Sequence, residues 1–328
     1  MIGIGIIGAG GWGERHAAAI KNLDGVTLIA ACRTNKSALD DFCKRHHCTG
    51  FTEYQDVVNH SQVDAVVIAT PNHLHIPVAL AAAQAGKPFL LEKPLAPTLT
   101  ECDEIVEAVD KAGVLGMVGF VNRFTQSYQL AKRQLDDGEV GKPVQGISTM
   151  SRFWMTSNRQ PWHLDYETGG GVLLNLGIHA LDRLNWLLDS PVERVSARLS
   201  TDFHDQKADD NGLLFLSYKS GAAGVVTSTG YAQGGPKHLT ELICTKGMLN
   251  IEYGKGVWLG QDDQWKHLPY ALTDDWMQDA MDEEWRQFVH AVTHNEQSPV
   301  SLESARHVMA VIFAAMESSR TGKEVKVQ

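Results

Sequence analysis

The feature that most constrains the fold is a glycine-rich segment near the start of the chain, Gly8-Ala9-Gly10-Gly11-Trp12-Gly13. It directly follows the apolar stretch Ile2–Ile7 and opens helix-like sequence that extends to Asn22. In a strand–turn–helix unit the first glycine permits a tight turn, the second lets backbone approach a pyrophosphate, and the third lets the helix pack on the strand. The helix N-terminus adds N–H groups and partial positive charge. We therefore expect a dinucleotide to bind at Gly8, Gly10, Gly11, Trp12 and Gly13.

Short apolar segments alternate with helix-like segments over about the first 120 residues. Strands are expected at Ile2–Ile7, Thr27–Cys32, Ala65–Ala69, Phe89–Leu91 and Leu115–Val118. Helices are expected at Trp12–Asn22, Lys36–His46, Ile76–Ala85 and Leu99–Ala112. Because continuously apolar strands are buried on both faces, this alternation predicts a parallel sheet covered by helices on each side.

The pattern changes after about residue 122. Helix-like stretches are expected at Gln126–Leu135, Leu173–Leu188, Asp279–Thr293 and Leu302–Ser319. Between Val192 and Tyr253 several alternating strands follow one another without helices, which indicates a largely antiparallel sheet. The predicted fold class is α/β, with a Rossmann doubly wound parallel sheet at residues 1–121 for the dinucleotide. Residues 122–328 form an α+β domain with an open, mostly antiparallel sheet for substrate binding and oligomerisation. The bare face of such a sheet predicts a homodimer or homotetramer.

Composition excludes several classes of function. The 328 residues carry a formal charge of -10 that is dispersed along the chain, so a nucleic-acid partner is not expected. No segment approaches membrane-spanning length, and no membrane partner is expected. The five cysteines are scattered, as is typical of free thiols in a reducing compartment, which predicts a cytoplasmic protein. Cys43, His46, His47 and Cys48 lack a second ligand pair at zinc-like spacing, so no metal is expected.

The end of the second expected strand bears on the choice of dinucleotide. An NAD site favours an acidic residue there, to accept hydrogen bonds from the ribose diol. This chain has Cys32-Arg33-Thr34-Asn35-Lys36, with no carboxylate before Asp40. A guanidinium at Arg33, helped by Thr34, would attract a 2′-phosphate, so we expect NADP to be preferred and NAD to be accepted. The alternative is that Arg33 stacks over the adenine and tolerates both.

Five segments, taken in order, resemble the Gfo/Idh/MocA family of oxidoreductases, named for glucose–fructose oxidoreductase and inositol dehydrogenase. They are the glycine turn, Ala69-Thr70-Pro71-Asn72-His73-Leu74-His75, Glu92-Lys93-Pro94, the long segment from Gly169-Gly170-Gly171 through His179 to Asp182, and Thr321-Gly322-Lys323-Glu324-Val325. The resemblance covers nearly the whole chain. It implies a catalytic role for Lys93 and for His179.

Reasoning from the fold leads to the same part of the molecule. In an open parallel sheet, ligands bind at the carboxyl ends of the strands. Two segments fall just past expected strands and should face one crevice with the dinucleotide; their residues are Thr70, Pro71, Asn72, His75, Glu92 and Lys93. The Lys93 cation would orient a substrate hydroxyl and favour a developing alkoxide. A salt bridge to Glu92 or a surface position is the structural alternative for this lysine.

The expected substrate contacts lie mainly in the second domain. His179 and Asn175 are four residues apart on an expected helix and should share one face, with His179 accepting a proton. Some family members carry aspartate in place of Asn175, and arginine is common in place of His163. Trp162 can stack on a sugar or cap the pocket. Asn122 and Arg123 resemble a segment that lines the crevice, although Arg123 can instead form an ion pair between domains. We interpret the polar stretch from Asp202 to Asp210 as a solvated hairpin end.

Three functions remain distinct at this point. The leading hypothesis is a dehydrogenase or reductase that transfers a hydride between the nicotinamide and a hydroxyl-bearing carbon of a sugar, inositol or related polyol. The second is a glycoside-cleaving or epimerising enzyme that retains NAD through the cycle, since the same lysine and histidine would serve that chemistry. The third is a non-catalytic dinucleotide-binding sensor on the same fold.

Overall fold

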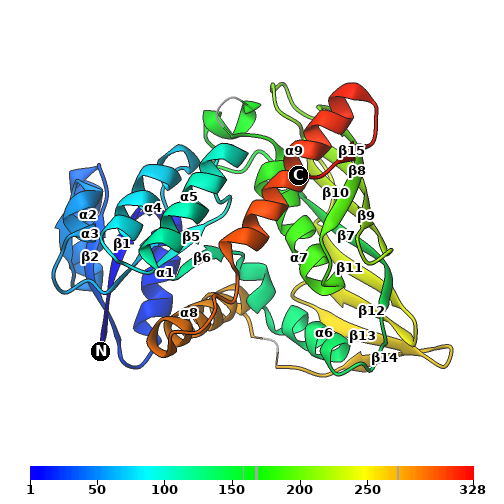
Figure 1. The fold of residues 1–328 in the computed structure, drawn as a ribbon, viewed down its shortest axis with the longest axis horizontal. Helices are drawn as coiled ribbons and strands as arrows, with labels where there is room; N and C mark the ends of the chain where they lie inside the picture. Colours follow the sequence, from blue (N-terminus) through cyan, green and yellow to red (C-terminus); the bar gives the residue numbers. More distant parts are fainter. Residues whose placement is uncertain (158, 167–168, 272) are drawn as a thin grey trace. The chain divides into compact units, whose positions relative to one another are not determined.

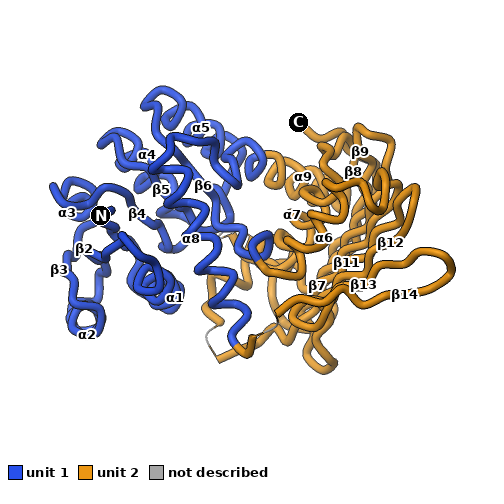
Figure 2. Tube along the Cα trace, turned by 90° about the horizontal axis from the view of Figure 1, so that it is seen from below, with its two compact units in different colours: residues 1–124, 275–306 blue, residues 125–274, 307–328 orange. Residues whose placement is uncertain are grey.

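The computed structural model describes residues 1–157, 159–166, 169–271 and 273–328 (Figure 1). The chain divides into two compact units (Figure 2). Unit 1 contains residues 1–124 and 275–306, and unit 2 contains residues 125–274 and 307–328. These units differ from the predicted domains in residues 122–124 and 275–306, which belong to unit 1.

Unit 1 is built on a six-stranded sheet with the order β3-β2-β1-β4-β5-β6. All neighbouring strands in it are parallel. The strands are β1 (Ile2–Ile7), β2 (Val26–Cys32), β3 (Thr49–Phe51), β4 (Ala65–Ile68), β5 (Phe89–Glu92) and β6 (Gly116–Gly119). Every residue of β4, β5 and β6 is buried, because helices cover both faces. The strand order reverses between β1 and β4, and a ligand crevice forms at such a switch point.

The helices of unit 1 follow the strands in alternation. They are α1 (Gly11–Lys21), α2 (Lys36–His46), α3 (Tyr54–Val58), η1 (Asn72–Leu74), α4 (His75–Gln84), α5 (Leu99–Ala112), η2 (Val121–Phe124) and α8 (Trp276–His294). α4 packs against α5, and α1 packs against α8, which returns to this unit from late in the chain (Figure 1). The predicted Rossmann architecture is confirmed, and β3 and α3 are short elements that the sequence did not predict.

Unit 2 contains a nine-stranded sheet with the order β14-β13-β12-β11-β7-β10-β9-β8-β15. Only β7 and β10 run parallel in the described ladder, so the sheet is mostly antiparallel, as predicted. The strands are β7 (Pro143–Phe153), β8 (Val192–Ser200), β9 (Asn211–Tyr218), β10 (Ala223–Tyr231), β11 (Lys237–Cys244), β12 (Gly247–Glu252), β13 (Gly256–Gln261), β14 (Gln264–Leu268) and β15 (Val325–Lys326).

One face of this sheet is covered by helices and the other is not. The helical elements in sequence order are α6 (Gln126–Asp136), η3 (Pro161–Leu164), the π-helix η5 (Leu173–Gly177), α7 (Ile178–Leu188) and α9 (Leu302–Thr321), whose first five residues belong to unit 1. Burial therefore alternates along the strands: in β9, Leu214 and Leu216 are fully buried, whereas Leu213 and Phe215 are 53% and 50% exposed.

The helix predicted at Leu173–Leu188 is not uniform. Its first five residues form the π-helix η5, and only from Ile178 onward is it an α-helix. The last residue of this π-helix, Gly177, is closely packed. A Cβ on it would lie 2.8 Å from a Leu173 side-chain carbon and 2.9 Å from Ser228 Oγ. π-Helical turns are frequent at functional sites.

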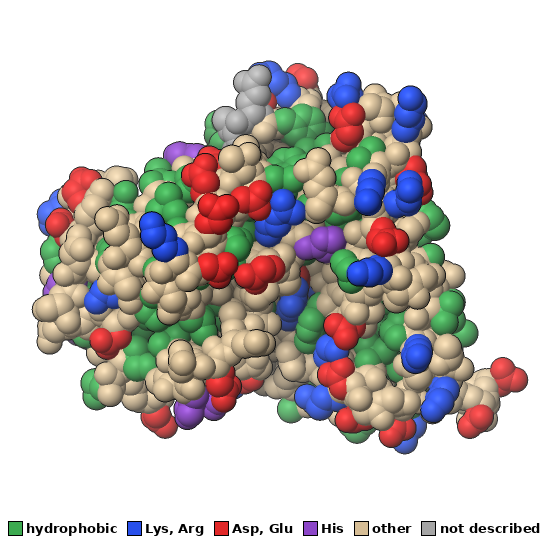
Figure 3. Space-filling model, viewed as in Figure 1, with side chains coloured by type: hydrophobic (Ala, Val, Ile, Leu, Met, Phe, Trp, Pro, Cys, Tyr) green, Lys and Arg blue, Asp and Glu red, His purple; other side chains and the backbone are tan. Residues whose placement is uncertain are grey.

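The charge distribution on the surface and the character of the helices bear on nucleic-acid and membrane partners. Acidic and basic side chains are interspersed over the face drawn in Figure 3, with no continuous basic area. Among the described helices, none combines the length and the apolar character needed to cross a bilayer.

Candidate functional site

The glycine turn of unit 1 has the geometry of a cradle. Gly8 adopts a φ of +107°, and a Cβ there would lie 2.4 Å from the carbonyl oxygen of Ala69. A Cβ on Gly13 would lie 2.6 Å from the carbonyl oxygen of Gly8, so this glycine lets α1 approach β1. Gly10 and Gly11 differ, because a Cβ on either would meet nothing within 4 Å. The backbone at Gly10 and Gly11 therefore faces open space, which fits a pyrophosphate.

The start of α1 adds to this fit. Gly10 is the N-cap residue, and no side chain among the described residues caps the helix. The first-turn N–H groups and the positive end of the helix dipole are therefore available to an anion. Trp12, in the same turn, is 44% exposed and flanks the cradle.

At the end of β2, Arg33 lies across the glycine turn. Its Nη1 donates a hydrogen bond of 3.0 Å to the carbonyl oxygen of Ala9. Thr34 is exposed, Asn35 caps α2 by accepting from the Ala38 N–H, and Lys36 pairs with Asp40. The first carboxylate after the strand is therefore already engaged by a lysine. The end of β2 presents a cation where an acidic residue would select a ribose diol.

Two turns at the carboxyl ends of β4 and β5 are joined by His75. Its Nδ1 lies 2.8 Å from the carbonyl oxygen of Pro94, and its Nε2 lies 3.1 Å from the carbonyl oxygen of Thr70. Burial lowers the pKa of His75. A neutral imidazole has one N–H and can donate to only one of these carbonyls. The predicted ligand residue His75 is thus fully buried and ties the two turns together.

The side chains beside His75 include an unsatisfied hydroxyl. Thr70 Oγ1 is buried without a hydrogen-bond partner among the described residues. Asn72 opens η1, directly after Pro71. An orphaned polar atom at the carboxyl end of a Rossmann strand fits a polar ligand, because an unpaired buried group is costly.

Glu92 is the last residue of β5 and Lys93 follows it, and the residues that hold Glu92 were not predicted from the sequence. The Glu92 carboxylate Oε1 lies 3.1 Å from Nε2 of His16, and the Nε1–H of Trp285 donates to Nδ1 of His16 at 2.9 Å. His16 and Trp285 are fully buried, and Glu92 is 8% exposed. The spacing of His16 with the buried Ala17 and Ile20 on α1 was a usable signal, whereas nothing near Trp285 in the sequence links it to α1.

In unit 2, His179 lies in the first turn of α7 and is 9% exposed. Asn175 lies in the π-helix before it, and its Nδ2 donates to the carbonyl oxygen of Gly171 at 2.8 Å. The predicted spacing of four residues therefore spans a junction of two helix types. At least one N–H of Asn175 holds the chain at Gly171.

The triple glycine Gly169–Gly171 precedes this helix, and glycines at such a place can let backbone approach a ligand. A Cβ on Gly170 would instead lie 2.6 Å from the backbone carbonyl of His163, and one on Gly171 would lie 2.3 Å from Oδ1 of Asp209. These glycines allow close packing of the chain on itself.

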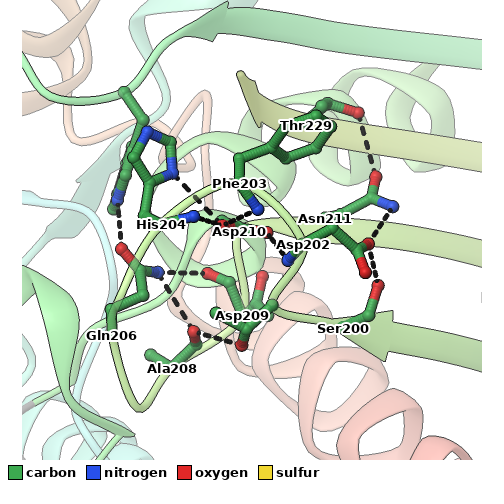
Figure 4. A network of polar contacts seen from close by, with 12 residues as sticks. Ser200, Asp202, Phe203, His204, Gln206, Ala208, Asp209, Asp210, Asn211 and Thr229 are labelled. Atoms are coloured by element: carbon green, nitrogen blue, oxygen red, sulfur yellow. Dashed lines mark hydrogen bonds and ion pairs between the residues drawn. The ribbon is translucent and has the colours of Figure 1, made fainter. Parts of the chain in front are cut away.

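The interpretation of residues 202–210 as a solvated hairpin end is wrong for its last two members. Asp209 and Asp210 are completely buried. The Asp210 carboxylate accepts hydrogen bonds from the backbone N–H groups of Asp202, Phe203 and His204, and organises the loop (Figure 4). Charge alone suggested solvation, but a carboxylate that accepts several backbone N–H groups can be buried.

Asp209 anchors the start of the helix that carries His179. Its Oδ2 accepts from the Leu173 N–H at 2.8 Å, and its carbonyl oxygen accepts from the Val172 N–H at 2.9 Å. Gln206 holds the same carbonyl oxygen from the other side, at 3.0 Å (Figure 4). Burial raises the pKa of Asp209 to about 6.

The remaining predicted residues fall in two places. Asn122 and Arg123 lie in η2 of unit 1 and are buried, with the Arg123 guanidinium 5.8 Å from the centre of the Phe120 ring. Trp162 and His163 lie in η3 of unit 2, with their rings stacked at 3.6 Å. The structure thus gathers the predicted cofactor residues, with Asn122 and Arg123, in unit 1. It places Trp162, His163, Asn175 and His179 in unit 2.

Two family models match different parts of the chain. Residues 2–120 match the family described as "Oxidoreductase family, NAD-binding Rossmann fold", and residues 128–250 match the "GFO/IDH/MocA C-terminal domain". The scyllo-inositol 2-dehydrogenase (NAD(+)) of Bacillus subtilis (strain 168) is 30% identical over 252 residues, which are 75% of this chain and 72% of that protein. The myo-inositol 2-dehydrogenase of Thermotoga maritima is 28% identical over 335 residues, covering 99% and 98%.

A solved structure shows the same fold over the full length. The crystal structure of an NAD binding oxidoreductase from Klebsiella pneumoniae superimposes with a TM-score of 0.91 at 25% identity, covering 100% of this chain and 99% of that one. The resemblance seen in the sequence is confirmed by these matches.

Proposed function

The chain belongs to the Gfo/Idh/MocA family of oxidoreductases, and on that premise we propose that it transfers a hydride between the nicotinamide of NAD(P) and a hydroxyl-bearing carbon of a sugar, inositol or related polyol. The observation that carries the proposal is the cradle at Gly10 and Gly11, open to a pyrophosphate, in the same unit as Glu92 and Lys93 at the end of β5. When bound there, the dinucleotide supplies the hydride acceptor.

The proposed roles of the side chains follow from their chemistry. Lys93 orients the substrate hydroxyl through Nζ and stabilises its negative character as the proton leaves. His179 accepts that proton at its imidazole ring. Asn175, on the same helical segment, holds a neighbouring hydroxyl through its side-chain amide, which can both donate and accept hydrogen bonds.

The substrate class rests on the polar lining and on the relatives. Hydrogen-bonding side chains outnumber apolar ones among the predicted substrate contacts, which suits a polyol better than an apolar ketone; these contacts are Lys93, Asn122, Arg123, Trp162, His163, Asn175 and His179. Two relatives are named inositol dehydrogenases. A panel of sugars and polyols with oxidised cofactor, and of their carbonyl forms with reduced cofactor, tests the proposal through nicotinamide absorbance. Failure of every compound would refute it.

The alternatives predict different behaviour in the same assay. An epimerising or glycoside-cleaving enzyme would co-purify with NAD that never exchanges. A non-catalytic sensor would bind dinucleotide with no turnover on any compound. The names of the relatives favour the dehydrogenase over both.

For the cofactor, we propose that NADP is preferred over NAD. Arg33 retains donors besides the one that Ala9 uses, and a guanidinium pairs well with a phosphate. Fluorescence titration with NADPH and NADH should show tighter binding of NADPH, and Arg33→Ala should remove that preference. A clear preference for NADH that Arg33→Ala leaves unchanged would contradict the proposal.

We also propose that a second copy of the chain covers the bare face of the nine-stranded sheet. Large apolar side chains are exposed there on β9, β11 and β12: Leu213, Phe215, Ile243 and Met248. Exposed apolar area of this kind typically marks an interface. A homodimer or homotetramer in sedimentation at micromolar concentration is expected, and a monomer would contradict the proposal.

With all five cysteines unpaired in the structure, we place the protein in the cytoplasm.

A further inference from the structure

Glu92 belongs to a buried polar cluster in unit 1. It consists of His16 on α1, Glu92 at the end of β5, and Glu284 and Trp285 on α8, which packs against α1 (Figure 1). His16, Glu284 and Trp285 are fully buried. Polar groups are costly to bury unless they are hydrogen-bonded. Glu92 of this cluster directly precedes Lys93 in the sequence.

The hydrogen bonds fix where the proton of His16 lies. An indole N–H can only donate, so Nδ1 of His16 must accept from Trp285 and carries no proton. A neutral imidazole then has its single N–H at Nε2, which faces Oε1 of Glu92 at 3.1 Å. His16 is thus held as the neutral Nε2–H tautomer, and Glu92 must accept.

Glu284 differs from Glu92 in its hydrogen bonding. Both of its carboxyl oxygens are buried without a hydrogen-bond partner among the described residues. Burial, together with the negative charge of Glu92, raises the pKa of Glu284 well above its ordinary value. Glu92 has the His16 N–H as a hydrogen-bond donor and Glu284 has none among the described residues, so a proton in this cluster belongs on Glu284.

Titratable groups on the adjoining elements include His75 on α4 and Arg123 on η2. Burial is the main cause of the lowered pKa of His75, and the opposite charges of Glu92 and Lys93 act on this ring as well. Arg123 is the charged residue of η2, which packs against α8. The sign of the charge on Glu92 therefore matters to the surroundings of Lys93.

We propose that His16 is a positioning residue for Lys93: locked as the neutral Nε2–H tautomer by Trp285, it keeps Glu92 ionised beside the lysine, while Glu284 holds the proton of the cluster. This rests on the proposed function for the role of Lys93. Without the His16 donor, Glu92 competes with Glu284 for that proton. The negative charge next to Lys93 is then lost at a higher pH.

Two substitutions of His16 separate this role from simple packing. Gln can accept from Trp285 through its amide oxygen and donate to Glu92 through its amide nitrogen, whereas Leu fills the space and does neither. The measurement is kcat/KM against pH with the substrate found in the panel. His16→Leu should move the acidic limb to higher pH by about one unit or more, because hydrogen bonds to charged groups are the stronger ones. His16→Gln should restore the limb to within about 0.3 unit of its original position.

A second histidine–glutamate pair in the same unit provides the matched control. His46 Nε2 lies 2.7 Å from Oε2 of Glu14, also on α1, but His46 is near the surface. His46→Leu removes one imidazole from a carboxylate on the same helix and should leave the acidic limb in place. An unmoved limb in His16→Leu, or an equal shift in His16→Gln, would overturn the proposal.

Two spectroscopic measurements test the cluster without activity. Nitrogen NMR of the His16 ring at pH 7 should show a proton on Nε2 and none on Nδ1, and Trp285→Phe should abolish this preference. Infrared spectra should show a protonated carboxyl group without hydrogen bonds, which Glu284→Gln removes. The Nδ1–H tautomer, or no such carboxyl signal, would refute the inference while leaving the proposed function intact. Absence of turnover with both signals present would instead refute the function.

Discussion

Two glycine-rich segments, each in front of a helix, are used differently. In unit 1, Gly10 and Gly11 face open space at the start of α1. In unit 2, Gly170 and Gly171 lie against His163 and Asp209. The same residue type in a similar sequence setting thus borders open space in one unit and allows close chain packing in the other. A run of glycines predicts close approach, but not what approaches.

The two helix N-termini differ in the same way. No side chain caps α1 among the described residues, so its dipole can act on an anionic ligand. The helix that leads to His179 starts against Asp209, which accepts from the N–H groups of Val172 and Leu173. Unit 2 fills its helix N-terminus with its own carboxyl group. We therefore expect phosphate binding at the helix N-terminus of unit 1.

The largest expected effect comes from removing the proposed catalytic group of each unit. General acid–base catalysis contributes about 10²–10⁴-fold, so His179→Ala should lower turnover by roughly that factor. Lys93→Ala should be at least as damaging, because positioning and charge stabilisation are lost together. Turnover and dinucleotide affinity are the measurements. His294→Ala, a change at the exposed end of α8, is the control.

Neither catalytic variant should abolish dinucleotide binding, since the cradle at Gly10 is intact in both. Near-normal turnover in both variants would contradict the assignment. Loss of affinity in parallel with turnover would make Lys93 and His179 structural.

The next effect separates the two glycine segments. Gly170→Ala forces a Cβ to within 2.6 Å of backbone, which should lower the unfolding free energy by about 1–3 kcal/mol. Gly10→Ala places a Cβ in open space at a φ of -103°, so stability should change by less than about 0.5 kcal/mol. Dinucleotide affinity should instead fall by about tenfold or more in Gly10→Ala.

Thermal unfolding and fluorescence titration of both alanine variants give the comparison. If Gly10→Ala destabilised the protein as much as Gly170→Ala, or if only Gly170→Ala weakened dinucleotide binding, the distinction between the two segments would be lost.

Most of the architecture could be predicted from the sequence. The spacing of apolar residues located most strands and helices of unit 1, because buried parallel strands are continuously apolar. The strand β7 was missed, since its half-buried sequence Pro143–Phe153 contains glycine, serine and threonine. The return of α8 to unit 1 was not predicted, because periodicity shows that a helix has an apolar face and not what the face packs against.

The candidate site was predictable where a motif fixes backbone geometry, and less so where distant residues meet. The cradle follows from spacing within six residues. The contact of His16 with Trp285 joins residues 269 positions apart, and no local pattern signals it. Asp209 was misjudged for the converse reason: its sequence neighbours are polar, but its partners are backbone N–H groups of a distant helix.

A third prediction concerns the anchor that distinguishes unit 2. Because the folded pKa of Asp209 is raised from 3.8 to about 6, the folded state binds its proton more tightly than the unfolded state. The associated stability is present below pH 3.8 and is lost as pH rises to about 6. Relative to Asp209→Asn, the wild type should lose at most about 3 kcal/mol over this window.

Denaturant unfolding of both proteins at several pH values measures this difference. Asp205→Asn, in the exposed part of the same loop, should change the unfolding free energy by less than about 0.5 kcal/mol. A difference between wild type and Asp209→Asn that does not vary from pH 4 to pH 6 would show that burial does not raise the pKa of Asp209.

The smallest expected effect is that of Asn175→Asp. The Nδ2 group of Asn175 donates to the Gly171 carbonyl oxygen at 2.8 Å, and an ionised carboxylate cannot donate. The lost hydrogen bond should cost about 1–2 kcal/mol at pH 7.5. The cost should shrink at pH 4, close to the ordinary Asp pKa of about 3.9, where a protonated carboxyl can donate again. The control is Asn185→Asp on α7, because Asn185 uses Oδ1 to accept from Tyr218 and would keep that bond as Asp.

Denaturant unfolding of both variants at both pH values measures the two costs in unfolding free energy. Equal costs that do not change with pH would mean that added charge, and not the lost donor, is responsible. A cost confined to Asn175→Asp and relieved by acid would show that this amide holds the chain at Gly171, as the glycine packing in unit 2 requires.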